Sequence, residues 1–217
     1  MKAGKSIKKT YTVVCKIIRF ACFMVTAGVF MLFCGCSGRD DVNFRQKDLY
    51  ERFLRNEVEV EGETYSQLFS FMIDDFGADP EAYYFDVDED GFDELLISTY
   101  YYGFWIYDIK NDNLVLLDCG NGTAEVCGVY LGNGHVYVGH SDFTHVGRQL
   151  LTLDRYDANG EIVEHMQIDA QYWDSETDQY DESSDFTFNG EKITMQEYED
   201  YMNTYTHVQD LKPVSEE

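Results

Sequence analysis

Apolar positions recur at helical spacing in three parts of the chain. Two of these patterns lie near the amino terminus and predict helices over about 44–56 and 64–77. The second helix is marked by a capping box formed by Thr64 and Gln67. The third pattern follows Thr194 and predicts a helix at the carboxyl-terminal end. Helical segments therefore lie on both sides of a long central region.

The central region, from about residue 82 to 190, has a different pattern. It consists of short runs rich in β-branched and aromatic residues, and Asn, Asp and Gly separate several of these runs, as is typical of strands joined by tight turns. Asn189 and Gly190 predict a two-residue hairpin turn. Short turns between successive strands imply antiparallel pairing. The expected fold class is therefore α+β, with two N-terminal helices packed on an antiparallel β-meander of about seven to nine strands and a C-terminal helix.

The first 35 residues differ from the rest of the chain in charge. They contain six Lys or Arg and no Asp or Glu, and an uncharged apolar run of 13 residues covers 21–33. This run is shorter than the roughly 20 residues of a membrane-spanning helix, but it matches the apolar core of an export signal. The pattern predicts a signal peptide over 1–35. An uncleaved membrane anchor and an ordinary secretory signal are the alternatives.

Gly35 and Cys36 follow the apolar run, and this segment resembles a bacterial lipobox. The resemblance implies that Cys36 is diacylated and becomes the first residue of the mature protein. Two acyl chains hold a protein stably to a membrane, where one holds it only marginally. We therefore expect a lipidated Cys and tether over 36–43, a single domain over 44–212 and a polar tail over 213–217. The expected location is the extracytoplasmic face of the bacterial cell membrane.

Charge excludes nucleic acid as a partner. The whole chain has 16 Lys+Arg and 41 Asp+Glu, for a net charge of −25, and all the acidic residues lie beyond residue 35. A surface of this kind repels phosphate backbones, whereas nucleic-acid binding needs clustered Lys and Arg. With 44% hydrophobic and 16% aromatic residues the chain can still bury a core. The composition indicates a folded, acidic domain.

Two cysteines other than Cys36 remain after the predicted signal peptide, namely Cys119 and Cys127. In an exported domain two such thiols favour a disulfide, which here would close a small loop. Two reduced, half-buried thiols are the alternative. Their spacing supports neither redox catalysis nor a zinc site.

The segment Asp86–Glu94, with sequence DVDEDGFDE, carries the clearest chemical motif. Carboxylates at its positions 1, 3, 5 and 9 can converge on one cation, and the Gly at position 6 permits a sharp turn. Oxygen ligands suit Ca²⁺, which takes about six to eight of them. An EF-hand is not favoured, because position 12 is not Glu and the flanking runs are typical of strands. A metal-free acidic β-turn is the alternative. The candidate calcium ligands are Asp86, Asp88, Asp90, the backbone carbonyl of Phe92, and Glu94.

This segment resembles the β-hairpin calcium loops of FG-GAP or VCBS-like repeats, whose pattern is DxDxDGxxD before an apolar strand. Glu94 replaces the final Asp of that pattern. Together with the lipobox and the closing helix, the loop resembles poorly characterised surface lipoproteins of Gram-positive bacteria. The resemblance implies calcium binding and surface display, and no known activity.

Other constellations are weaker. His135, His140 and His145 are spaced by five, which matches neither a helix face nor a strand face and does not favour a zinc site. The aromatic tract over 100–107 is consistent with a platform for sugar stacking, but a buried central hairpin explains it equally well. None of the motifs GxSxG, HExxH, GxGxxG or the P-loop occurs in the sequence.

The sequence therefore predicts a lipid-anchored, calcium-stabilised surface module that binds an extracellular protein or glycan and is not an enzyme. The alternative is a cell-envelope or polysaccharide hydrolase using paired carboxylates, a class defined by the distance between two acids rather than by their spacing in sequence. A purely structural envelope protein is a third hypothesis.

Overall fold

The computed structural model describes residues 38–99, 101–173 and 178–214. The predicted signal peptide and Cys36 lie outside the described residues. The chain divides into two compact units, Met1–Asp48 and Leu49–Glu217, and every strand belongs to the second unit. No helix in the described part of the chain combines the length and hydropathy that a membrane span requires.

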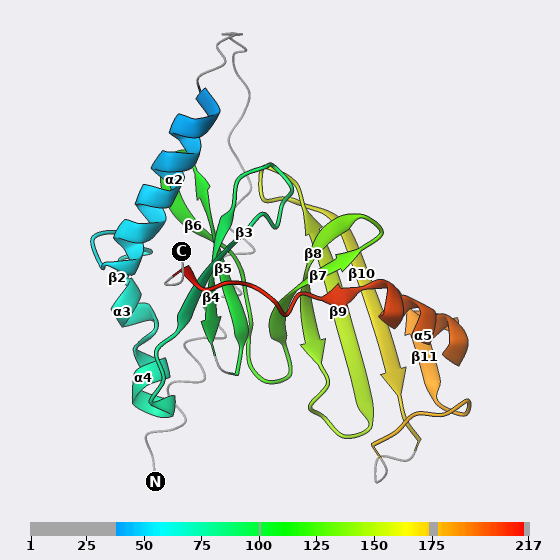
Figure 1. The fold of residues 1–217 in the computed structure, drawn as a ribbon. Coiled ribbons are helices and arrows are strands. Elements are labelled where there is room, and N and C mark those ends of the chain that lie inside the picture. The colour runs from blue at the N-terminus through cyan, green and yellow to red at the C-terminus, as the bar shows by residue number, and fades with distance from the viewer. Residues whose placement is uncertain (1–37, 100, 174–177, 215–217) are drawn as a thin grey trace. The chain divides into compact units, whose positions relative to one another are not determined.

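The described residues form an α+β fold that is mostly sheet (Figure 1). The helices are α2 (Gly38–Leu54), α3 (Tyr65–Leu68), α4 (Ser70–Phe76) and α5 (Met195–Thr204). The strands are β1 (Glu59–Val60), β2 (Glu63–Thr64), β3 (Glu81–Phe85), β4 (Glu94–Thr99), β5 (Gly103–Lys110), β6 (Asn113–Cys119), β7 (Val126–Gly132), β8 (His135–Asp142), β9 (Arg148–Tyr156), β10 (Ile162–Gln171), β11 (Asp185–Phe188), β12 (Glu191–Ile193) and β13 (Thr206–His207).

One sheet of eleven strands dominates the second unit. Its first four strands, β3 to β6, pair with their neighbours in antiparallel order, and so do β7 to β12. The two runs are joined where β7 pairs with β5 rather than with β6, and this pairing is parallel. The predicted seven to nine strands were too few, and the sheet is mixed rather than purely antiparallel. Short strands such as β12 and β13 add pairings that hydrophobic runs alone do not mark.

Three segments of backbone meet closely where the two runs join. We call this meeting point, formed by Gly103, Gly120 and Cys127, the junction. The Cys127 amide donates to the carbonyl of Tyr102 at 3.0 Å, and the Gly120 amide donates to that of Phe104 at 3.1 Å. A Cβ atom at Gly103 would lie 1.8 Å from the Cys127 carbonyl oxygen. A Cβ atom at Gly120 would likewise lie 1.6 Å from the Tyr102 carbonyl oxygen, so positions 103 and 120 leave no room for a side chain.

Tight turns join the antiparallel strands as the sequence predicts. Asn189 and Gly190 both have positive φ, at 51° and 81°, between β11 and β12. Asn133 and Gly134 repeat this geometry between β7 and β8, with φ of 53° and 81°. Two successive positive φ angles give the turn a twist that matches the twist of the paired strands.

The helices begin where their capping signals predict. Thr194 and Glu197 form a complete capping box ahead of α5, and Thr64 and Gln67 form another ahead of α3. The predicted helix over 64–77, however, is interrupted at Phe69, which separates α3 from α4.

Apolar side chains form three buried clusters. The first lies between α5 and the β7–β11 part of the sheet, the second contains residues of α2, α3–α4, β4 and β5, and the third lies where the two runs of strands face each other. Their central members are Tyr137, Leu153, Ile168 and Tyr198 in the first, Tyr50, Phe53, Leu95 and Tyr107 in the second, and Val87, Leu96, Cys127 and Val138 in the third.

The edge strands β12 and β3, at the two ends of the main strand order, differ in length and in pairing. At one end β12 has only three residues, including Glu191 and Lys192. At the other end lies β3, where Tyr83 forms a single antiparallel bridge with Pro213 from the end of the chain.

Candidate metal site

The loop after β3 is the acidic segment identified in the sequence. Strands β3 and β4 pair antiparallel with Phe85 opposite Glu94, so the first and last acids of the loop start from neighbouring strands. Glu89 and Gly91 have φ of 60° and 88°, and these two positive angles reverse the chain within the loop. Local sequence therefore explains the hairpin, because glycine adopts positive φ without a steric cost.

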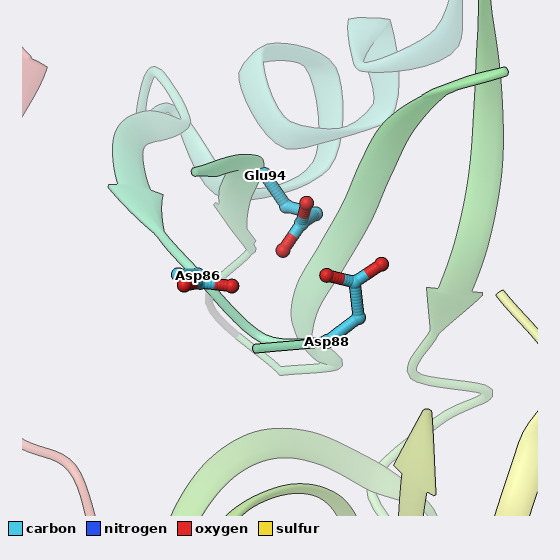
Figure 2. A group of neighbouring side chains, drawn as sticks. All are labelled: Asp86, Asp88 and Glu94. Atoms are coloured by element: carbon cyan, nitrogen blue, oxygen red, sulfur yellow. The ribbon is translucent and has the colours of Figure 1, made fainter. Parts of the chain in front are cut away.

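Three carboxylates of this loop converge. Asp86, Asp88 and Glu94 each offer an oxygen that lies within 4.8 Å of the oxygens of the other two, and Figure 2 shows the side chains turned toward a common space. Asp88 is only 4% exposed and Glu94 only 1%. Negative charges rarely gather in a buried position without a compensating cation, since burial and mutual repulsion both oppose it.

Backbone amides hold the carboxylates in place. The Val87 amide donates to Glu94 Oε2 at 2.7 Å, the Gly91 amide donates to Asp86 Oδ2 at 3.0 Å, and the Asp90 amide donates to Asp88 Oδ1 at 3.1 Å. These bonds use one oxygen of each carboxylate.

Two of the remaining carboxylate oxygens have no hydrogen-bond partner. Asp86 Oδ1 and Asp88 Oδ2 are both buried and accept no hydrogen bond. Buried polar atoms are normally satisfied, so such atoms require an explanation. Together with Glu94 they provide the oxygen chemistry that Ca²⁺ prefers, and the described residues therefore fit a calcium ion.

The pKa values of the three acids reflect the same crowding. Burial and then the charge of Asp88 raise the pKa of Glu94 to about 9. Burial and then the charge of Asp90 raise the pKa of Asp88 to about 6, and burial also raises the pKa of Asp86. A bound cation would offset these effects by stabilising the charged forms.

The other two predicted ligands are placed differently. Asp90 is not among the three converging carboxylates, and its Oδ1 accepts a hydrogen bond from the Phe92 amide at 2.8 Å. The contribution of the Phe92 carbonyl stays a prediction. Three of the five predicted ligands are thus brought together.

Two charged residues of β5 that were not predicted also belong to this site. Asp108 is 4% exposed, and its charge contributes to the raised pKa values of Asp88 and Glu94. Lys110 Nζ forms an ion pair with Asp108 and lies 3.7 Å from Asp88 Oδ2. Leu95 is paired with Tyr107, so the next positions bring Asp108 beside Glu94. The proximity of Asp108 to Glu94 depends on the register between β4 and β5, which the sequence alone does not specify.

The evenly spaced histidines do not share a site. His135 contacts Glu89, and His145 contacts Asp142. His140 is buried and its Nε2 lies 3.1 Å from Asp118 Oδ2. Among the described residues the only group of three or more metal-ligating side chains found is the one in the acidic loop.

A buried polar network surrounds Asp118 on β6. Its Oδ2 accepts a hydrogen bond from the Tyr156 hydroxyl at 2.7 Å, and its Oδ1 accepts one from the Cys119 amide at 2.8 Å. Burial alone would raise the pKa of Asp118, but the hydrogen bond and charge of His140, together with the bonds from Tyr156 and Cys119, lower it. Burial alone would likewise lower the pKa of His140, and Asp118 raises it. Each member of the pair therefore favours the charged form of the other.

Cys119 and Cys127 are buried thiols that are not joined by a disulfide in the structure. Cys119 lies opposite Trp105 at the end of β6. Cys127 lies beside Gly103 and belongs to the third core cluster. Both are free thiols in this structure, and the disulfide between them stays a prediction.

The aromatic tract contributes mainly to the core. Tyr107 is buried, and Trp105 packs against the second core cluster, where its ring centroid lies 5.4 Å from that of Phe69. Tyr101, in contrast, is exposed. The described part of the tract therefore fits a buried hairpin better than a surface platform.

No protein-family model, curated protein or solved structure matches the chain.

Proposed function

We propose that the Asp86–Glu94 hairpin binds one calcium ion and that this ion stabilises an extracytoplasmic surface protein anchored through a lipid on Cys36. In this proposal the folded domain binds an extracellular protein or glycan. The observation that carries the calcium proposal is the convergence of three carboxylates with two buried oxygens that accept no hydrogen bond.

The ion is proposed to have a structural role. Asp88 and Glu94 are almost inaccessible, so a substrate could not reach a metal ion that they hold. The ion would join the end of β3 to the start of β4, where Val87 of the loop and Leu95 of β4 belong to two of the core clusters. We also infer that the end of α2 from Leu49 onward packs on the sheet together with α3–α4, because Phe53 and Phe69 share a cluster with Leu95.

Calcium is expected to raise the thermal stability of the protein. An ion that binds only the folded state stabilises it by about 2.7 kcal/mol when the free concentration is 100 times Kd. Unfolding of the full chain in mild detergent, followed by circular dichroism with Ca²⁺ or with a chelator, measures this effect. Asp88→Asn should abolish it, because one charged ligand is lost from the buried group.

The matched control for this experiment is Asp93→Asn. Asp93 lies in the same loop but not among the three converging carboxylates, so its variant should retain the full calcium effect. If the unsubstituted protein has the same melting curve in Ca²⁺ and in chelator, the calcium proposal is wrong. In chelator, Asp88→Asn should be at least as stable as the unsubstituted protein, because it removes a buried negative charge.

Replacing Cys36 is expected to release the protein from the membrane. Cys36→Ala removes the only proposed lipid attachment site, so the variant should lose incorporation of labelled palmitate and leave the membrane fraction. Cys34→Ala removes a neighbouring thiol and should retain both. A Cys36→Ala protein that is still labelled would disprove the lipid anchor.

A further inference from the structure

The carboxylates of the acidic loop already have one cationic neighbour. Lys110 extends from the end of β5, and its side chain is 26% exposed. Its Nζ is paired with Asp108, lies 3.7 Å from Asp88 Oδ2 and donates to the carbonyl of Ala158 at 2.8 Å. The ammonium group is therefore held at the edge of the group formed by Asp86, Asp88 and Glu94.

The ammonium group of Lys110 is positively charged and lies beside Asp88, so it balances part of the negative charge that a metal ion would balance. The Nζ of Lys110 is ion-paired with Asp108 and lies 3.7 Å from Asp88 Oδ2, so it places a positive charge beside the loop carboxylates. A single positive charge only partly balances the acids beside it, and Asp86 Oδ1 and Asp88 Oδ2 accept no hydrogen bond.

We propose that Lys110 is the built-in counter-cation of the acidic loop and competes with calcium for it. This inference rests on the proposed calcium site and assigns the control of its affinity to a residue outside the loop. When the metal is absent, the ammonium of Lys110 balances part of the negative charge. When the metal binds, the two cations repel each other across Asp88, and this repulsion weakens the binding.

Asp108 has the opposite role in this arrangement. Its carboxylate holds Lys110 to one side and adds negative charge beside Glu94. Removing the charge of Asp108 frees the ammonium to move toward Asp88 and also reduces the attraction for a cation. The two partners of one ion pair therefore influence calcium affinity in opposite directions.

The experiment measures calcium affinity by titration calorimetry on the full chain in detergent, after removal of metals. Lys110→Gln is expected to bind Ca²⁺ about tenfold more tightly than the unsubstituted protein, and Asp108→Asn about tenfold more weakly. Lys110→Arg keeps the charge and should bind calcium like the unsubstituted protein. Lys192→Gln is the matched control, because Lys192 pairs with Asp185 at 3.0 Å on a different strand and should leave the affinity unchanged.

The outcomes separate this inference from the calcium proposal itself. If the unsubstituted protein binds calcium and Lys110→Gln binds it no more tightly, Lys110 does not compete with calcium, and the proposed calcium site is supported. If the unsubstituted protein binds none and Lys110→Gln does, Lys110 occupies the site and the native calcium function is wrong. If neither binds, both are wrong. Should Lys110→Gln not fold, Lys110→Met removes the same charge, and it should also bind calcium more tightly than the unsubstituted protein.

Discussion

Replacing Gly103 with alanine is expected to lower the free energy of unfolding by more than about 4 kcal/mol, the range reserved for severe disruptions. Gly103 lies at the junction with φ of 72°, and an added Cβ would lie 1.8 Å from the carbonyl oxygen of Cys127. That oxygen is part of the backbone, so it cannot move without separating β5 from β7. Denaturant unfolding of Gly103→Ala measures the loss.

Gly134→Ala is the matched control for the junction. Gly134 has a similar φ of 81° in the turn between β7 and β8, but an added Cβ would meet nothing within 4 Å. This variant therefore carries only the backbone strain of a left-handed conformation, about 1–2 kcal/mol. Equal losses in the two variants would mean that φ alone sets the cost and that the close contact at the junction has no effect.

Removing the charge of Asp118 is expected to cost about 3–5 kcal/mol, the loss typical of breaking a buried ion pair from one side. Asp118→Asn preserves the shape of the side chain but leaves His140 without its anion, and it weakens the bond from the Tyr156 hydroxyl. Both members of the pair are largely buried, with side-chain exposures of 9% for His140 and 12% for Asp118. Solvent therefore replaces the lost interaction poorly.

The cost of Asp118→Asn should depend on pH. The lowered pKa of Asp118 contributes stability above its unfolded value of about 4, and the raised pKa of His140 contributes stability below its unfolded value of about 6.5. The difference between the two proteins should be largest between these values and decrease as the pH rises through the raised pKa of His140. Urea unfolding of both proteins at several pH values measures this difference.

An exposed pair provides the control for the buried one. Asp185 and Lys192 have side-chain exposures of 46% and 77%, so Asp185→Asn should change stability by less than about 0.5 kcal/mol at any of these pH values. A loss in Asp118→Asn as small as this would show that the buried network contributes no net stability.

The features that the sequence predicted correctly depend on neighbouring residues. The capping boxes at Thr64 and Thr194, the turn at Asn189 and Gly190, and the hairpin around Asp86 are each encoded within a few positions of the chain. Residues this close in sequence make the same contacts with one another in almost any fold that contains the segment. For this reason three of the predicted ligands could be placed together without knowledge of the sheet.

The features that the sequence did not reveal depend on distant residues. The interruption at Phe69 is one example: Phe69 is buried beside Trp105, and the Met72 amide donates to the Phe69 carbonyl in a tighter turn than an α-helix has. Local apolar spacing cannot anticipate such a break. The parallel step from β5 to β7 and the placement of Asp108 beside Glu94 likewise arise only once the register of separate strands is set.

The edge strands β12 and β3 affect whether molecules at high concentration associate through their sheets. A long open edge offers unpaired amides and carbonyls to the strands of other molecules, and such edges promote polymerisation. Here the terminal strand β12 has three residues, with charges at Glu191 and Lys192, and β3 is bridged by Pro213, which has no amide hydrogen to donate. These two edge strands therefore offer few free backbone groups to the strands of a neighbouring molecule.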